Sequence, residues 1–396
     1  MRFEFTTPPR IVFGSGALRE AAPAARALGR HAFVVTGRDA SRATPLLDQL
    51  RAEKLNVTTF AIAGEPTTDA VIAATSTARA AGCDLVIGFG GGSALDAAKA
   101  VSALLTNDGE LLDYLEVVGR GAALTRAAAP CIAIPTTAGT GAEVTRNAVL
   151  SAPTSNVGPA LVAVPPPRVK VSLRSPLMLP RLALVDPDLT LGLPSALTAA
   201  SGLDALTQLI EPYTSCRAHP YTDALCLDGL RRIAPALRRA YHDGRDAAAR
   251  NDLALAALSS GLALANAGLG AAHGFAGPIG GMFPAPHGAV CAALLPFVIE
   301  VNLRAIRART PAAPTAHRYA EIARLLTGRA DATADAAAPF VRDLVTELQI
   351  PPLRTYGLTS AHVPALVEQA ARASSMKANP LPLTPAELTE ILTRAL

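Results

Sequence analysis

The alternation of short apolar runs with alanine-rich stretches is the feature that most narrows the folds open to this chain. Up to about Leu189, runs of β-branched residues alternate with stretches that have the pattern of helices. The clearest runs are HAFVVTG (31–37), CDLVIGFG (83–90) and CIAIPTT (131–137). Strands that alternate with helices are typical of βαβ units, which build a parallel sheet. We therefore predict a Rossmann-like α/β domain over residues 1–190.

The second half of the chain has a different pattern. After Leu193 the β-branched runs disappear, and helical patterns continue to the end, separated by turns expected at EPY (211–213) and AHPY (218–221). A length of 396 residues also suits two domains better than one. We therefore predict an all-helical bundle domain over 191–396. The stretch 151–170, rich in proline and serine, is expected to be a long loop or an edge hairpin.

Composition and charge argue against several classes of function. The net charge is only +4, the arginines form no basic block, and aromatic residues make up 4%, which disfavours nucleic-acid binding. No export signal is visible, and the uncharged stretch 253–272 contains serines, an asparagine and glycines, which favour a buried helix over a membrane span. The cysteines lack CxxC spacing and stand in apolar contexts typical of buried thiols, so we expect a cytoplasmic protein. They are Cys83, Cys131, Cys216, Cys226 and Cys291.

Two glycine-rich loops follow predicted strands. In CDLVIGFGGGSALDAAKA (83–100) a strand leads through three glycines into a helix opened by Ser93, and the amides at a helix start attract phosphate. A second loop, PTTAGTGAEVT (135–145), is dense in hydroxyls and glycines. Two such loops at neighbouring strand ends predict a dinucleotide site, with the pyrophosphate at Gly91, Gly92 and Ser93. The alternative is that these turns serve packing only.

The end of the first clear strand bears on the choice of nicotinamide cofactor. A carboxylate directly after this strand would bind the adenosine ribose and reject a 2′-phosphate. In VVTGRDAS (34–41), Gly37 and Arg38 come first and Asp39 follows. A guanidinium without a preceding carboxylate favours NADP slightly over NAD, unless Arg38 is only a solvated surface residue.

A buried carboxylate is expected in the helical half. Asp204 and Gln208 are four residues apart in SGLDALTQLIEPYTS (201–215), so they share one face of a helix. An unpaired carboxylate among apolar residues is costly, and it needs a cation, a helix start or hydrogen-bond donors. Asp204 is therefore either a helix cap or a metal ligand.

Two histidines stand fourteen positions apart in HGFAGPIGGMFPAPHG (273–288). On one continuous helix His273 and His287 would be about 21 Å apart, too far to share an ion. We expect the chain to break and turn back between them at Pro278, Gly280, Gly281, Pro284 and Pro286. The two are then either unrelated loop histidines or, with Asp204, an O, N, N set that suits Zn²⁺ or Fe²⁺.

Five ordered motifs across the whole length resemble the iron-containing, or group III, alcohol dehydrogenase family. They are GGGSALDAAKA, PTTAGTGAEVTRNAV, LALVDPDLT, GLDALTQLIEPY and HGFAGPIGGMFPAPHG. The resemblance implies the fold shared with dehydroquinate synthase, with a dinucleotide-binding domain, a helical domain and a catalytic metal in the cleft between them. It also implies at least a homodimer.

The family pattern carries over unevenly to this chain. Asp204, His273 and His287 match three of the four implied metal ligands, but the fourth position is Gln208. Gln208 would contribute its carbonyl oxygen or hydrogen-bond a metal-bound water. The histidine implied for proton transfer is replaced by Gly277. Further cofactor contacts are expected, several of them from the resemblance, at Asp96, Thr136, Thr137, Thr140, Thr145 and Lys170.

The resemblance predicts an NAD(P)-dependent alcohol dehydrogenase or aldehyde and ketone reductase. Its catalytic residues would be Asp204, His273 and His287, with Fe²⁺ or Zn²⁺ polarising the carbonyl. One alternative is a metal-free reductase of activated keto acids, similar to the maleylacetate reductases. Others are a sugar-phosphate cyclase of the dehydroquinate synthase type, disfavoured because no Lys or Arg cluster surrounds Asp204 and His273, and a degenerate nucleotide-binding protein.

Overall fold

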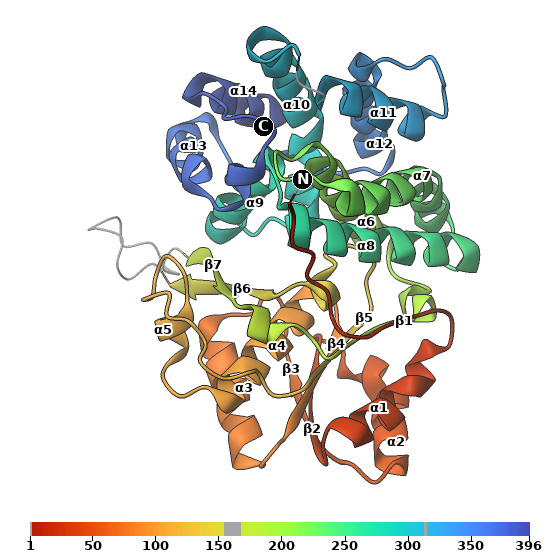
Figure 1. Cartoon of the computed structure of the whole chain (residues 1–396), viewed down its shortest axis with the longest axis vertical. Helices are drawn as coiled ribbons and strands as arrows, with labels where there is room; N and C mark the ends of the chain where they lie inside the picture. Colours follow the sequence, from red (N-terminus) through yellow and green to blue (C-terminus); the bar gives the residue numbers. More distant parts are fainter. Residues whose placement is uncertain (1, 154–167, 313–314) are drawn as a thin grey trace. The chain divides into compact units, whose positions relative to one another are not determined.

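The computed structural model describes residues 2–153, 168–312 and 315–396. The chain forms two compact units (Figure 1). The α/β unit consists of Thr6–Thr137 and Gly141–Thr190, and the helical unit of Leu191–Leu396 with Met1–Phe5 and Ala138–Thr140. Two short segments therefore group with the helical unit although they precede it in the chain.

The α/β unit is built on a six-stranded sheet in the order β1-β8-β5-β4-β2-β3. Every neighbouring pair is parallel, as the sequence pattern predicts. The strands are β1 (Ile11–Phe13), β2 (His31–Thr36), β3 (Asn56–Ala61), β4 (Leu85–Gly90), β5 (Cys131–Pro135) and β8 (Leu182–Val185). Its helices are α1 (Ala21–Leu28), α2 (Thr44–Ala52), α3 (Thr68–Ala80), α4 (Gly92–Thr106) and α5 (Leu111–Tyr114).

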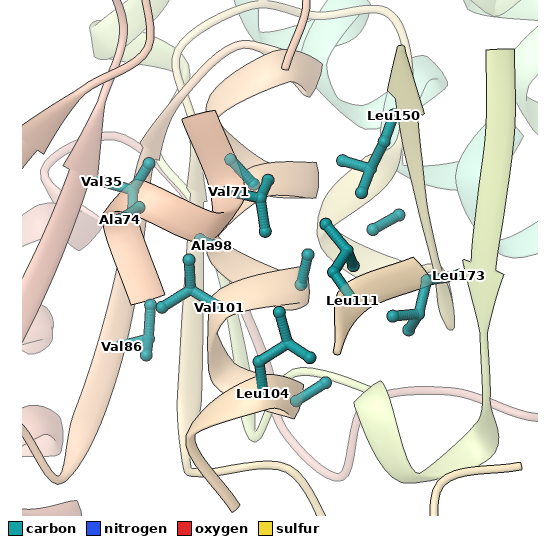
Figure 2. Close-up of a cluster of buried hydrophobic side chains, with 14 of the residues drawn as sticks. Val35, Val71, Ala74, Val86, Ala98, Val101, Leu104, Leu111, Leu150 and Leu173 are labelled. Carbon is teal, nitrogen blue, oxygen red and sulfur yellow. The ribbon is translucent and has the colours of Figure 1, made fainter. Parts of the chain in front are cut away.

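Helices cover both faces of this sheet. Along β2, Ala32 and Val34 belong to the apolar cluster that contains α1 and α2, while Phe33 and Val35 belong to the cluster that contains α3 and α4 (Figure 2). Successive strand residues point to opposite faces. A strand buried on both faces must be apolar throughout, which explains the uninterrupted apolar runs in the sequence.

The strand order places a switch point between β2 and β4. From β2 the chain passes to β3 on one side and then returns across β2 to β4 on the other. Ligands of open α/β sheets bind outside the carboxyl ends of the strands at such a point. Gly37 follows β2 and Gly90 ends β4, and a Cβ on Gly90 would lie 3.3 Å from the Gly37 nitrogen.

A second, antiparallel pair of strands joins the α/β unit. β6 (Asn147–Pro153) pairs with β7 (Arg168–Arg174) from Asn147–Arg174 to Pro153–Arg168. The two ends of the stretch 151–170 are therefore strands, as in the hairpin alternative, and its middle lies outside the described residues.

Helices make up the second unit, and the described residues after Leu191 contain no strand. They are α6 (Ser195–Thr214), α7 (Pro220–His242), α8 (Ala247–Ala267), α9 (Ala271–Met282), α10 (His287–Arg309), α11 (Thr315–Thr327), α12 (Ala337–Glu347), α13 (Val363–Arg372) and α14 (Pro385–Ala395). Helix α6 packs against α7, α8 and α10, and every residue from Gly202 to Thr214 is buried. Polar side chains on α6 must therefore find partners inside the protein.

Short 3-10 helices complete both units. In the α/β unit they are Ala17–Glu20, Ala40–Ala43, Ala142–Val144, Pro176–Met178 and Pro187–Thr190. In the helical unit they are Ala334–Ala336, Leu353–Tyr356, Ser360–His362 and Ser375–Ala378.

The chain between the two histidines breaks only once. We expected Pro278, Gly280 and Gly281 to interrupt it, but α9 continues through them to Met282, and the break spans 283–286. An interior proline costs a helix about 3 kcal/mol. The burial of Phe275 and Ile279 on α9 offsets this cost, since both are 0% exposed.

The apolar helices of the second unit are buried, but not all of the cysteines are. Helix α10 is long and apolar enough for a membrane span, but 78% of its most apolar window is buried inside the protein. The uncharged stretch 253–272 is divided between α8 and α9, which bend by 98°. Of the five cysteines, Cys216 is exposed and Cys83 only half-buried, so the expectation of buried thiols is wrong there. Cys216 lies in the turn between α6 and α7 and is exposed, although its Sγ donates to the Lys377 oxygen at 3.7 Å.

Candidate functional site

Four potential metal ligands converge in the helical unit. Asp204 comes from α6, His273 from α9, and His287 and Cys291 from α10, and their ligand atoms all lie within 4.8 Å of one another. His273 Nε2 is 3.3 Å and His287 Nε2 is 3.8 Å from Asp204 Oδ1. The two imidazole rings, fourteen residues apart in sequence, have their centroids 5.4 Å apart. The structure thus brings together the three residues that the sequence pattern singles out.

Two atoms at the centre of this cluster have no hydrogen-bond partner. They are Asp204 Oδ1 and His273 Nε2, both buried, which face each other at 3.3 Å and form an ion pair only if Nε2 is protonated. Buried polar atoms without partners are rare in native proteins because each has lost its contacts with water. A cation between them would satisfy both, and carboxylate and imidazole donors suit Zn²⁺ or Fe²⁺. The residues therefore fit a divalent metal.

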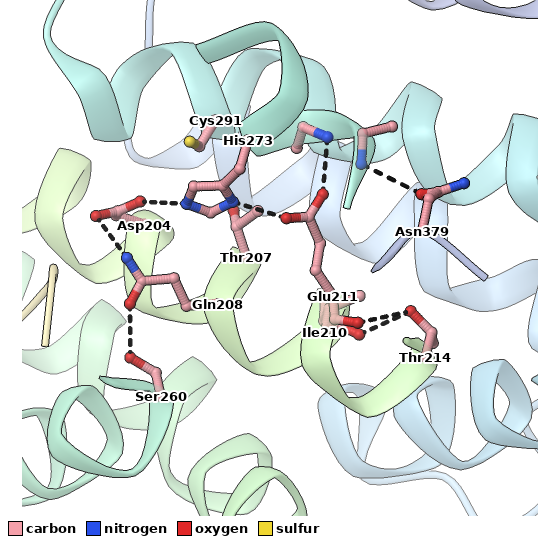
Figure 3. A network of polar contacts seen from close by, with 12 residues as sticks. Asp204, Thr207, Gln208, Ile210, Glu211, Thr214, Ser260, His273, Cys291 and Asn379 are labelled. Atoms are coloured by element: carbon pink, nitrogen blue, oxygen red, sulfur yellow. Dashed lines mark hydrogen bonds and ion pairs between the residues drawn. The ribbon is translucent and has the colours of Figure 1, made fainter. Parts of the chain in front are cut away.

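Glu211 orients His273. The Nδ1 of His273 donates to Glu211 Oε2 at 2.7 Å, and the backbone nitrogen of Ala272 donates to Glu211 Oε1 at 2.7 Å (Figure 3). Because a carboxylate only accepts, the ring hydrogen must be on Nδ1, and the lone pair of the neutral ring is then on Nε2, facing Asp204. Metal-binding histidines are commonly held by a carboxylate in this way.

Sequence reasoning missed Glu211 because we expected EPY to be a turn. Glu211 instead lies inside α6, whose last turn contains Pro212. The spacing of four and then three residues from Asp204 through Gln208 to Glu211 places all three on one helix face. That spacing was the available signal.

Gln208 supports Asp204. Its Nε2 donates to Asp204 Oδ2 at 3.1 Å, and its Oε1 accepts from Ser260 Oγ on α8 at 3.0 Å. The amide nitrogen must face the carboxylate, which cannot donate, so the carbonyl oxygen points toward α8 (Figure 3). In this arrangement Gln208 does not offer its oxygen to the cluster. Asp204 itself stands in the middle of α6, which excludes the helix-cap alternative.

The charges around the cluster favour a cation. Burial opposes the charged form of His273, yet Cys291, Glu211 and Asp204 raise its pKa well above the usual value. Burial raises the pKa of Asp204, but the nearby His287 and His273 lower it by more than burial raises it, so the pKa of Asp204 lies below its usual value. Burial raises the pKa of the Cys291 thiol to about 11. The field that favours a proton on His273 would equally favour a metal ion in its place.

The members of the cluster differ in exposure. The side chains of Asp204 and His273 are 2% and 4% exposed, whereas that of His287 is 34% exposed. Gly277 lies one turn after His273 on α9, and a Cβ there would meet no atom within 4 Å. A small molecule can therefore reach the cluster beside His287, and position 277 has room for a larger side chain.

The β4–α4 turn of the α/β unit can hold an anion. Gly91 is the residue before α4, no side chain caps the helix, and a Cβ on Gly91 would lie 3.4 Å from the side chain of Thr137. The two glycine-rich loops are thus neighbours, and the first amides of α4 are left without a side-chain partner. Helix α4 begins at Gly92, so Ser93 lies inside it and does not open it as expected.

The remaining cofactor candidates differ in their surroundings. Asp96 accepts from the Val149 nitrogen at 3.1 Å, and Arg38 donates to the Ala63 oxygen at 3.0 Å. Lys170 forms an ion pair with Glu65. Thr136 is buried at the end of β5, and Thr140 lies in the segment Ala138–Thr140 of the helical unit.

Sequence reasoning also missed Lys99. Its side chain is 0% exposed, and its Nζ forms an ion pair with Asp96 at 2.9 Å. The same nitrogen donates to Thr145 Oγ1 and to the Ala142 oxygen, both at 2.8 Å. Lys99 thereby ties α4 to the second glycine-rich loop.

Comparisons with known proteins agree over the whole length. The model of the iron-containing alcohol dehydrogenase family matches residues 8–187, and that of the Fe-containing alcohol dehydrogenase family, C-terminal, matches 198–396. The chain is 34% identical to the probable alcohol dehydrogenase EutG of Salmonella typhimurium, covering 99% of this chain and 94% of the relative. Among solved structures, 1,3-propanediol oxidoreductase has a TM-score of 0.88 at 31% identity, covering 100% of both chains. Sulfoacetaldehyde reductase from Bifidobacterium kashiwanohense, solved in complex with NAD⁺, has a TM-score of 0.84 at 28% identity, covering 99% of this chain and 98% of the other.

Proposed function

The chain belongs to the iron-containing alcohol dehydrogenase family and is an oxidoreductase of alcohols and carbonyls, and from this premise we propose a metal-assisted, NAD(P)-dependent enzyme. It transfers hydride between nicotinamide and a small aldehyde, ketone or alcohol. Asp204, His273 and His287 hold the divalent metal. The observation that carries this proposal is the buried pair of atoms Asp204 Oδ1 and His273 Nε2, which face each other at 3.3 Å and have no hydrogen-bond partner.

The side chains of the cluster prepare the site for a carbonyl. A bound metal supplies a Lewis acid for the carbonyl oxygen, and the nicotinamide supplies or accepts the hydride. Glu211 keeps the Nδ1 hydrogen of His273 in place, so that Nε2 remains a ligand. Gln208 holds Oδ2 of Asp204 and leaves Oδ1 facing the histidines. Glycine at position 277 has no side chain to relay a proton, so water beside His287, or a ribose hydroxyl of the cofactor when bound, would have to supply it.

We also propose where the cofactor binds and which form it takes. The pyrophosphate lies on the amides of Gly91, Gly92 and Ser93, where no side chain caps α4. NADP(H) is favoured slightly over NAD(H), because Gly37 leaves no carboxylate after β2 and Arg38 follows it. The enzyme is proposed to act in the cytoplasm as a homodimer or larger homo-oligomer, on the family resemblance and the cysteine pattern.

The test is elemental analysis of the wild type and of His273→Ala, both purified without chelator. About one Fe or Zn per chain, largely lost in the variant, is expected, with aldehyde-dependent oxidation of NADPH or NADH in the metal-loaded wild type. Because the nucleotide site belongs to the other unit, cofactor affinity does not report on the helical unit, and circular dichroism with thermal unfolding of the variant will show that it is folded. Wild type that contains no metal and regains none with Fe²⁺ or Zn²⁺ would refute the proposal.

One observation favours a second candidate. The carbonyl oxygen of Gln208, at a family ligand position, points to Ser260 and away from the cluster. A metal-free reductase of activated keto acids would account for this orientation. Turnover of a keto acid in the presence of a strong chelator, with none for simple aldehydes, would support this candidate over the metal-assisted one.

A further inference from the structure

Cys291 stands where a metal ligand would stand. It follows His287 by four residues on α10, so both side chains share one helix face. Its Sγ lies 3.9 Å from His287 Nε2, and within 4.8 Å of the ligand atoms of Asp204 and His273. In Figure 3 the sulfur of Cys291 lies next to the imidazole ring of His273.

The distances fit a tetrahedral ion. Zinc bonds of about 2.0–2.1 Å to nitrogen or oxygen and 2.3 Å to sulfur give a tetrahedron with edges of about 3.3–3.6 Å. The corresponding separations in the cluster are 3.3 Å for His273–Asp204, 3.8 Å for His287–Asp204 and 3.9 Å for Cys291–His287. No two of the four ligand atoms are more than 4.8 Å apart, so side-chain movements of about 1 Å would bring all four onto one ion.

The surroundings of Cys291 differ from those of the other buried thiols. Cys131 and Cys226 are also buried, but among the described residues only Cys291 belongs to a group of metal-ligating side chains. Asp204 Oδ1 and His273 Nε2, both buried and without a hydrogen-bond partner, face each other at 3.3 Å within 4.8 Å of the sulfur. These two atoms are an indication of a ligand that is independent of the cysteine.

The orientation of Gln208 leaves a coordination position unfilled on α6. Its oxygen is bonded to Ser260, and its nitrogen, a donor, faces Asp204. Resting on the proposed metal-assisted function, we propose that Cys291 replaces the ligand missing at position 208. The site then has one oxygen, two nitrogen and one sulfur donor. As the S–Zn bond forms, the thiol releases its proton to water, and no oxidation or reduction takes place.

The sulfur donor determines which metal is preferred. Thiolate favours Zn²⁺ over harder ions, so the site should bind Zn²⁺ in preference to Fe²⁺. A site with four protein ligands still admits a substrate oxygen, since zinc can expand to five ligands during catalysis.

X-ray absorption spectroscopy of the zinc-loaded full-length protein tests this proposal. One sulfur at about 2.3 Å is expected in the wild type, lost in Cys291→Ser and retained in Cys216→Ser, whose thiol is exposed and outside the cluster. Zinc affinity of Cys291→Ser should fall at least about tenfold. With Co²⁺, a thiolate charge-transfer band should appear in the wild type only. If Cys291→Ser does not fold, Cys291→Ala, which introduces no polar atom into the core, replaces it.

The outcomes separate this inference from the proposed function. Bound zinc with only nitrogen and oxygen neighbours in the wild type would overturn the role of Cys291 and leave the metal-assisted reductase standing. A sulfur neighbour that persists in Cys291→Ser would also overturn it. Failure to bind any divalent metal would overturn both.

Discussion

Replacing Glu211 by glutamine should weaken metal binding although no proposed ligand is changed. Glu211 accepts two hydrogen bonds with its two oxygens, from the Ala272 nitrogen and from His273 Nδ1, both at 2.7 Å. Glutamine has one oxygen and one NH₂ group, so one of these donors would face another donor. If the NH₂ faces the ring, Nδ1 must accept, the hydrogen moves to Nε2, and His273 can no longer bind a metal.

The size of the effect follows from burial. Glu211 is 4% exposed, so water cannot replace the lost contact. Hydrogen bonds to charged groups contribute about 1.5–3 kcal/mol and neutral ones about 0.5–1.5 kcal/mol. Loss of an outer carboxylate partner commonly reduces metal affinity about 10- to 100-fold, which corresponds to about 1.4–2.7 kcal/mol. We expect the loss of zinc affinity in Glu211→Gln to fall in this range.

The assay is a zinc titration against a competing chelator, with circular dichroism to confirm folding. Glu368→Gln is the matched control, because Glu368 forms an exposed ion pair with Arg372 that contributes little. Folded Glu211→Gln that binds zinc as tightly as the wild type would refute the reasoning that Glu211 sets the tautomer of His273.

Three further predictions concern other positions. Gly277→His, which has open space around its Cβ, should raise kcat for aldehyde reduction by about 100-fold, the lower end of what a positioned general acid contributes, with little change in KM; an unchanged kcat and pH–rate profile would count against it. Gly37→Asp, also free of steric conflict, should lower kcat/KM for NADPH at least about tenfold relative to NADH, because like charges placed together cost several kcal/mol; an unchanged ratio would mean that the 2′-phosphate lies elsewhere. Burial raises the pKa of Glu143 to about 7, so its protonated form stabilises the fold below about pH 4.5 and that contribution is lost as the pH rises through 7. Glu143→Gln should therefore gain up to about 3 kcal/mol of stability over the wild type at pH 8 but little at pH 4.5, in denaturant unfolding of both proteins; an equal difference at both pH values would contradict this.

The sequence by itself determined the architecture. The two periodicities predict the parallel sheet up to Leu189 and the helices after Leu193, because a strand covered on both faces is apolar throughout and a packed helix is apolar on a stripe. The glycine loop before α4 predicts an anion site for a local reason: a helix start presents amides whatever surrounds it. The motifs around Asp204, His273 and His287 also identified the family.

Only the tertiary structure decided how the cluster is completed. Sequence spacing places Cys291 on the same helix face as His287, but it does not show whether that face meets Asp204 and His273. That depends on which helices pack against the face, here α6 and α9. The continuation of α9 through Pro278 and the pairing of Glu211 with His273 have the same origin. Both depend on contacts between residues distant in sequence. Burial of α9 outweighs the helix-breaking tendency of Pro278, and the contact of α9 with α6 brings hydrogen-bond donors to the Glu211 carboxylate.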